Sequence, residues 1–159
     1  MRRDGIQHRM PSQREITVAP DRFEVAEDDA VLVTELRSAI AICVYDAVEE
    51  AGALLHLRCI VRSPKPADMT DSTLATELLL LDRCVESMRE VCPAARNLQA
   101  RVVVHLSDHP HARETFDPVL TMVEDFLSDA GLKLSPMDIA SGPVRNVRFR
   151  PSMGWLQTR

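Results

Sequence analysis

The chain has 159 residues, of which 45% are hydrophobic and 27% charged, and its formal net charge is −5. These values are typical of a soluble globular protein that builds one core of its own. They argue against a nucleic-acid-binding protein, because no basic stripe is interleaved with aromatic side chains. No apolar run approaches the roughly 18 residues that a membrane-spanning helix needs, so direct membrane insertion is not expected.

The start of the chain and its cysteines together predict a cytoplasmic protein. Residues 1–13 are polar and lack periodicity, so we expect a flexible tail there and a single domain over residues 14–159. The tail carries arginines but no apolar segment behind them, unlike a secretory signal. Four cysteines without a Cys-x-x-Cys pair are predicted to be free and mostly buried thiols in a reducing compartment: Cys43, Cys59, Cys84 and Cys92.

The first part of the chain is predicted to consist of strands. Alternating or β-branched segments indicate three short strands, over residues 15–19, 22–26 and 30–34. Residues 39–45 are apolar nearly throughout, as expected of a strand covered on both faces. A turn at residues 49–52 leads into a second apolar run over residues 53–61. These two runs are predicted to form a hairpin at the centre of the sheet.

A helix is predicted after the loop at Pro64–Pro66. Asp71 or Ser72 is expected to be its N-cap, and Pro93 lies just beyond its end. Apolar residues recur at steps of three and four, which predicts one buried stripe: Leu74, Leu78, Leu81, Val85 and Met88.

A second helix is predicted with Asp117 as its cap, Pro118 at its first position and Gly131 at its C-terminal end. Its buried face is expected to comprise Val119, Leu120, Val123, Phe126 and Leu127. Further strands are expected over residues 101–106, 132–134 and 144–150, with a short piece near Trp155. This order predicts an α+β fold with mixed or antiparallel, sandwich-like sheets and two main helices packed on one side.

One segment resembles a known family. Residues 38–46 read Ser-Ala-Ile-Ala-Ile-Cys-Val-Tyr-Asp, and residues 52–56 read Gly-Ala-Leu-Leu-His. They resemble the chemoreceptor glutamine deamidase (CheD) family, whose pattern reads roughly G-S-C-V-A-V-C-L-Y-D and then G-G-M-A-H. The resemblance places the family's catalytic cysteine at Ala39, its histidine at His56 and its upstream threonine at Thr34. The interval between positions 39 and 56 matches the family spacing.

The resemblance implies a cytoplasmic chemotaxis protein that needs no cofactor and no metal. Its relatives hydrolyse glutamine side chains of methyl-accepting chemoreceptors to glutamate and ammonia, and they also bind a chemotaxis phosphatase, CheC. Such hydrolysis needs a thiolate, a histidine that takes and returns its proton, and a group that orients the imidazole. His56 and Thr34 would supply the last two.

The chain departs from the family pattern around the nucleophile. Ala39 has no atom that could attack an amide carbon. One residue is missing between Thr34 and position 39, and the turn before it reads Glu35-Leu36-Arg37 where the family has glycines. Those residues resist the backbone conformations that glycine permits, which also weakens the expected anion-binding turn.

Other nucleophiles and other functions compete with this interpretation. Ser38 is expected to point to the opposite face of the strand, and Cys43 lies roughly 13 Å further along it. One alternative is a non-catalytic binding or regulatory protein that engages chemoreceptors or a phosphatase-like partner. A more distant one is a metal-dependent enzyme, although a solvated turn explains its candidate ligands more simply: His105, Asp108, His109 and His111.

Overall fold

The computed structural model describes residues 14–58 and 72–159. In the second segment the description of side chains begins at Ala75. Several predicted features lie outside this part of the chain. They are the tail over residues 1–13, the last residues of the strand predicted over 53–61, the loop at Pro64–Pro66, the cap at Asp71, the thiol of Cys59 and the side chain of Leu74.

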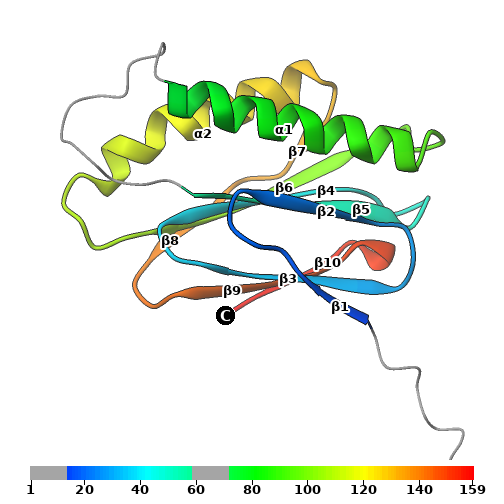
Figure 1. The fold of residues 1–159 in the computed structure, drawn as a ribbon, viewed down its shortest axis with the longest axis horizontal. Coiled ribbons are helices and arrows are strands. Elements are labelled where there is room, and N and C mark those ends of the chain that lie inside the picture. The colour runs from blue at the N-terminus through cyan, green and yellow to red at the C-terminus, as the bar shows by residue number, and fades with distance from the viewer. Residues whose placement is uncertain (1–13, 59–71) are drawn as a thin grey trace, which may run out of the picture.

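The fold has three layers, two stacked sheets and a pair of helices (Figure 1). The four-stranded sheet has the order β1 (Arg14–Thr17), β3 (Ala30–Leu36), β9 (Arg145–Arg150) and β10 (Trp155–Thr158). The six-stranded sheet has the order β2 (Arg22–Ala26), β5 (Ala51–Arg58), β4 (Ala39–Asp46), β6 (Gln99–Leu106) and β7 (Lys133–Leu134), with β8 (Asp138–Ser141) also paired to β6. Both sheets mix parallel and antiparallel pairs. The predicted α+β class is therefore confirmed.

Helices α1 (Ser72–Val91) and α2 (Ala112–Asp129) lie side by side over the outer face of the six-stranded sheet, as predicted (Figure 1). The sheet separates two apolar layers. One lies between the sheet and the helices, and the other lies between the two sheets. Any functional side chain in the second layer is thus held by strands of both sheets.

The predicted central hairpin is confirmed, because β4 pairs antiparallel with β5 on one side and with β6 on the other. Every residue of β4 is buried. Side chains of successive strand residues point to opposite faces, so Ile40 and Ile42 face the helices while Ala39 and Ala41 face the other sheet. The chain passes from β3 to β4, and hence from one sheet to the other, through two residues, Arg37 and Ser38.

The predicted start of the second helix is wrong. Helix α2 begins at Ala112, and Pro118 lies inside it. Ala112 and Phe116 are buried and continue the apolar stripe upstream at the helical period, so their packing outweighs the start signal of Asp117-Pro118. Asp117 forms an ion pair with Arg113 one turn earlier at 2.9 Å and is not the cap.

The two predicted helix faces need smaller corrections. Leu78, predicted to lie in the buried stripe of α1, is 38% exposed, and the buried residue at this level is Glu77. Residues three and four positions before Leu81 both lie near the stripe, so spacing alone does not choose between them. On α2, Phe126 is only partly buried, whereas the other predicted residues are buried. Gly131 follows the helix with φ 85°, as its predicted role requires.

Candidate functional site

Thr34 and His56 meet between the two sheets. Thr34 lies on β3, His56 lies on β5, and both side chains are buried. The Oγ1 atom of Thr34 is 2.7 Å from Nδ1 of His56 and 2.8 Å from the carbonyl oxygen of Val18. The two residues that the resemblance singled out are thus in direct contact, although 22 positions separate them in the sequence.

The hydrogen bonds assign the tautomer of His56. The Thr34 hydroxyl has one hydrogen and donates it to the Val18 carbonyl oxygen, which can only accept. Nδ1 of His56 must therefore donate its N–H to Oγ1 of Thr34. The lone pair is then on Nε2, the nitrogen that faces away from Thr34. This is the arrangement in which a hydroxyl orients an imidazole so that its other nitrogen can act as a base.

The surroundings of His56 favour its neutral form. It is 2% exposed, and this burial lowers the pKa of the imidazole below its usual 6.5. Asp21 opposes the shift and Arg58 adds to it. These two residues form an ion pair at 2.8 Å, and the Asp21 N–H donates to the His56 carbonyl oxygen. A neutral imidazole with a free Nε2 lone pair can accept a proton but needs a proton donor beside it.

Position 39 supplies no such donor. Ala39 is fully buried, with 0% exposure. In the strand register it lies opposite Arg58 on β5 and opposite His105 on β6, while His56 lies opposite Ala41. Ala39 is therefore a diagonal neighbour of His56 on the same face of the sheet, a separation that side chains can bridge. What is present there is a methyl group.

His105 lies in the segment 101–106 that was predicted as a strand, but the sequence grouped it with the loop histidines and did not place it beside position 39. It does not join the loop histidines but lies on β6, 6% exposed, on the face that looks toward the other sheet. Its Nδ1 is 2.9 Å from the backbone nitrogen of Ser38, and its Nε2 is 2.9 Å from the carbonyl oxygen of Gly142. The signal that could have placed it is alternation, because His105 shares the parity of the buried Val103.

Ser38 also differs from its prediction. It belongs to the turn between the sheets and not to the strand, with φ 51° in the left-handed region that favours glycine. Its backbone N–H points at the imidazole of His105. An N–H at the start of a strand, beside the position that the resemblance assigns to the nucleophile, is the kind of donor that can stabilise an oxyanion. In this structure that donor is already bonded.

The other predicted side chains do not complete a catalytic group. Cys43 and Cys84 are buried free thiols, and burial raises the pKa of both, to about 12 for Cys84. Cys92 is a partly buried free thiol. His109 and His111 contact each other with ring centroids 5.6 Å apart, while His105 bonds to the carbonyl oxygen of Gly142. The described residues contain no group of three side chains placed to hold a metal ion.

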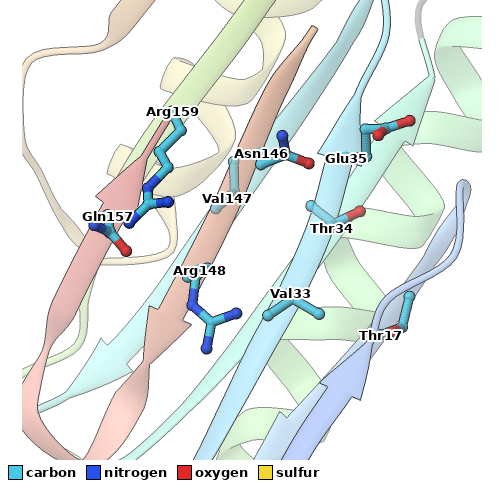
Figure 2. Close-up of a pocket in the computed structure, with 9 residues that line it drawn as sticks. All are labelled: Thr17, Val33, Thr34, Glu35, Asn146, Val147, Arg148, Gln157 and Arg159. Atoms are coloured by element: carbon cyan, nitrogen blue, oxygen red, sulfur yellow. The ribbon is translucent and has the colours of Figure 1, made fainter.

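A pocket lies on the outer face of the four-stranded sheet (Figure 2). This pocket measures about 510 Å³ and mixes charges and amides. Arg148 bonds to Glu15 at 2.8 Å, so the guanidinium is already partly neutralised. The lining residues are Thr17, Val33, Thr34, Glu35, Asn146, Val147, Arg148, Gln157 and Arg159. Of the predicted site residues only Thr34 borders it, and the Thr34 hydroxyl is bonded to His56.

Comparison with known proteins shows a distant similarity. No protein-family model matches the chain. A protein of Zymomonas mobilis subsp. mobilis, described as a probable chemoreceptor glutamine deamidase, CheD, is 24% identical over 135 residues, which cover 84% of this chain and 73% of the relative. In residues 14–58 and 72–159 no helix is long and apolar enough to cross a membrane. The chain is thus similar to a CheD deamidase along most of its length, at low identity.

Proposed function

We propose that this protein is a divergent member of the chemoreceptor glutamine deamidase family, that it acts in cytoplasmic chemotaxis signalling, and that it acts by binding and not by hydrolysis. The distant similarity to a CheD protein supports the family. Residues 14–159 would form one domain. Methyl-accepting chemoreceptors are the proposed partners, and a CheC-type phosphatase is the second.

The observation that carries the non-catalytic assignment is the methyl group of Ala39. Attack on a carboxamide needs a nucleophile within about 3 Å of a base. Beside His56 the proposed nucleophile position holds a fully buried alanine. The buried thiol of Cys43 is no substitute, because burial raises its pKa and so disfavours the thiolate.

The pair of Thr34 and His56 is then the remaining part of the site. In the family reaction His56 would be the base and Thr34 the residue that orients it, and their contact at 2.7 Å suits those roles. The same contact joins the two sheets through buried hydrogen bonds. A structural contribution therefore explains why the pair would persist after hydrolysis is lost.

The test is to incubate the purified protein with a glutamine-bearing fragment of a methyl-accepting chemoreceptor. We expect binding, measured by fluorescence anisotropy of the labelled fragment, without the mass increase that accompanies conversion of an amide to an acid. A fragment with alanine at the target glutamine is the matched control for the mass measurement. Deamidation of the first fragment alone contradicts the non-catalytic assignment, and absence of binding contradicts the proposed partner.

The Ala39→Cys variant asks whether the missing thiol is the whole defect. We expect no deamidation, because the neighbouring Ser38 N–H is bonded to His105. Ala53→Cys is the matched control, since Ala53 is a buried alanine of the same sheet whose side chain lies on the face toward the helices. Robust deamidation by the Ala39→Cys variant would show that the site is otherwise ready to react.

A further inference from the structure

His105 fills a polar gap between two turns. One wall is the backbone N–H of Ser38, and the other is the carbonyl oxygen of Gly142. Both turns use left-handed backbone, with φ 51° at Ser38 and 104° at Gly142. Two alanines flank the histidine in the strand register, Ala39 on β4 and Ala140 on β8. Small neighbours on both sides leave room for a ring at this point.

The hydrogen bonds of the gap are complementary to one arrangement of atoms. Nδ1 of His105 accepts from the Ser38 N–H, so Nδ1 carries no hydrogen. Nε2 then carries the hydrogen and donates it to the Gly142 carbonyl oxygen, which can only accept. The gap is therefore complementary to a planar group with one acceptor and one donor on two atoms that are joined through one carbon and point apart. A primary carboxamide presents the same pair, whereas a carboxylate presents two acceptors.

We propose that His105 is an internal ligand, whose imidazole occupies a carboxamide-recognising gap beside position 39 and closes that gap to any substrate. The meaning of the gap rests on the proposed function, because it lies next to the position that the family resemblance assigns to the nucleophile. The recognition itself rests only on the two hydrogen bonds and the burial of the ring. The chain thus keeps the polar walls of the gap and supplies their occupant from its own strand.

The test removes the side chain and offers small molecules in its place. In a His105→Gly variant, acetamide and imidazole should raise the melting temperature progressively as their concentration increases, because a ligand that binds the folded state stabilises it. Acetate, which matches acetamide in shape but has no N–H, should not. The wild-type protein, whose gap is filled, is the control and should respond to none of the three.

The outcomes decide the proposal directly. An equal response to acetate and acetamide, or no response of a folded His105→Gly variant to acetamide, overturns it. If that variant does not fold, His105→Asn and His105→Leu replace it, since they differ mainly in polarity. The asparagine variant should melt at the higher temperature, because its amide can meet at least one wall of the gap. The reverse order overturns the proposal.

Accessibility gives a second readout that needs no receptor. Position 39 is fully buried beside His105. Iodoacetamide should therefore alkylate a thiol introduced at position 39 at least about tenfold faster in the Ala39→Cys/His105→Gly double variant than in the Ala39→Cys variant. Equal rates in two folded variants would show that His105 does not close the gap. These results do not depend on chemoreceptor binding, so the inference and the proposed function can fail separately.

Discussion

The two ends of strand β4 are both tied to neighbouring loops by buried polar side chains, but they use different chemistry. At one end Asp46 accepts four backbone hydrogen bonds, from Val48 and Glu49 on one oxygen and from Arg96 and Asn97 on the other. At the other end the polar side chains are imidazoles of the two neighbouring strands: His105 of β6 accepts from the Ser38 N–H of the turn, and His56 of β5 bonds to Thr34 of β3. Each oxygen of the Asp46 carboxylate thus accepts two hydrogen bonds, and the side chain holds the two loops together.

The imidazole end differs because one nitrogen has no assigned role in the fold. Nε2 of His56 has no hydrogen-bond partner in the described part of the chain, whereas both nitrogens of His105 are bonded. Saturated buried groups contribute to stability, and an unsaturated one is a candidate for chemistry. Around strand β4 the comparison thus separates Asp46 and His105, whose polar side-chain atoms are all bonded, from His56, which has one nitrogen without a partner in the described part of the chain.

The largest expected effect is at the carboxylate end. Asp46→Ala should lower the free energy of unfolding by about 3 kcal/mol, because four backbone N–H groups lose their acceptor. Urea denaturation measures the change. Asp125→Ala on the exposed face of α2 is the control and should stay within about 0.5 kcal/mol of wild type. Similar decreases in the free energy of unfolding in both variants would contradict the structural role of Asp46.

A smaller decrease in the free energy of unfolding is expected for a change at Thr34, where the two sheets meet. Thr34→Val keeps the shape of the side chain but leaves the Val18 carbonyl oxygen and the His56 Nδ1–H without their partner, at a cost of about 2 kcal/mol. Thr34→Ser retains the hydroxyl and should recover most of that stability.

The ¹⁵N chemical shifts of the ring nitrogens of His56 should show the Nδ1–H tautomer in the wild-type protein. An Nε2–H tautomer there would undo the assignment.

The smallest effect is a dependence of stability on pH. The pKa of His56 is lowered in the folded protein, so between that value and 6.5 the unfolded chain binds a proton that the folded chain does not. The contribution of His56 is therefore fully present above about pH 6.5 and is lost as the pH falls through the folded value, by at most about 1.4 kcal/mol per pH unit.

A comparison with His56→Gln isolates this contribution. The variant cannot titrate in that window, so the stability difference between wild type and variant should narrow or reverse as the pH is lowered from 7 to 5. Denaturation curves at several pH values give the difference. Parallel pH profiles would mean that burial does not hold His56 neutral.

The sequence predicted best where one physical effect dominated. The apolar run over residues 39–45 has few options other than a buried central strand, and Gly131 adopts the left-handed backbone that ends a helix. Predictions failed where two signals competed. Asp117-Pro118 indicated a helix start, but the packing of Phe116 extends the helix upstream of it. Leu78 was predicted to be buried, but the same spacing also allows Glu77, which is the buried residue. Strand β8 (Asp138–Ser141) was missed, because a four-residue edge segment carries little pattern.

The site was predictable in part for a similar reason. The contact between Thr34 and His56 follows from the family resemblance, which carries long-range information that local patterns lack. His105 has no counterpart in that pattern, and its neighbours in sequence suggested a loop cluster. Its partners, Ser38 and Gly142, lie 67 and 37 positions away, so only the folded chain brings them together.

The two-residue connection between β3 and β4 limits where a residue could be added near position 39. One added residue that propagated into β4 would exchange the faces of its side chains, moving Ile40 and Ile42 between the sheets and Ala39 under the helices. The family pattern has one more residue here than this chain. A single-codon insertion can therefore be absorbed only within the turn of Arg37 and Ser38, where it would also displace the N–H that His105 holds. An insertion at this turn would therefore change the length of the connection and the contact of the Ser38 N–H with His105 together.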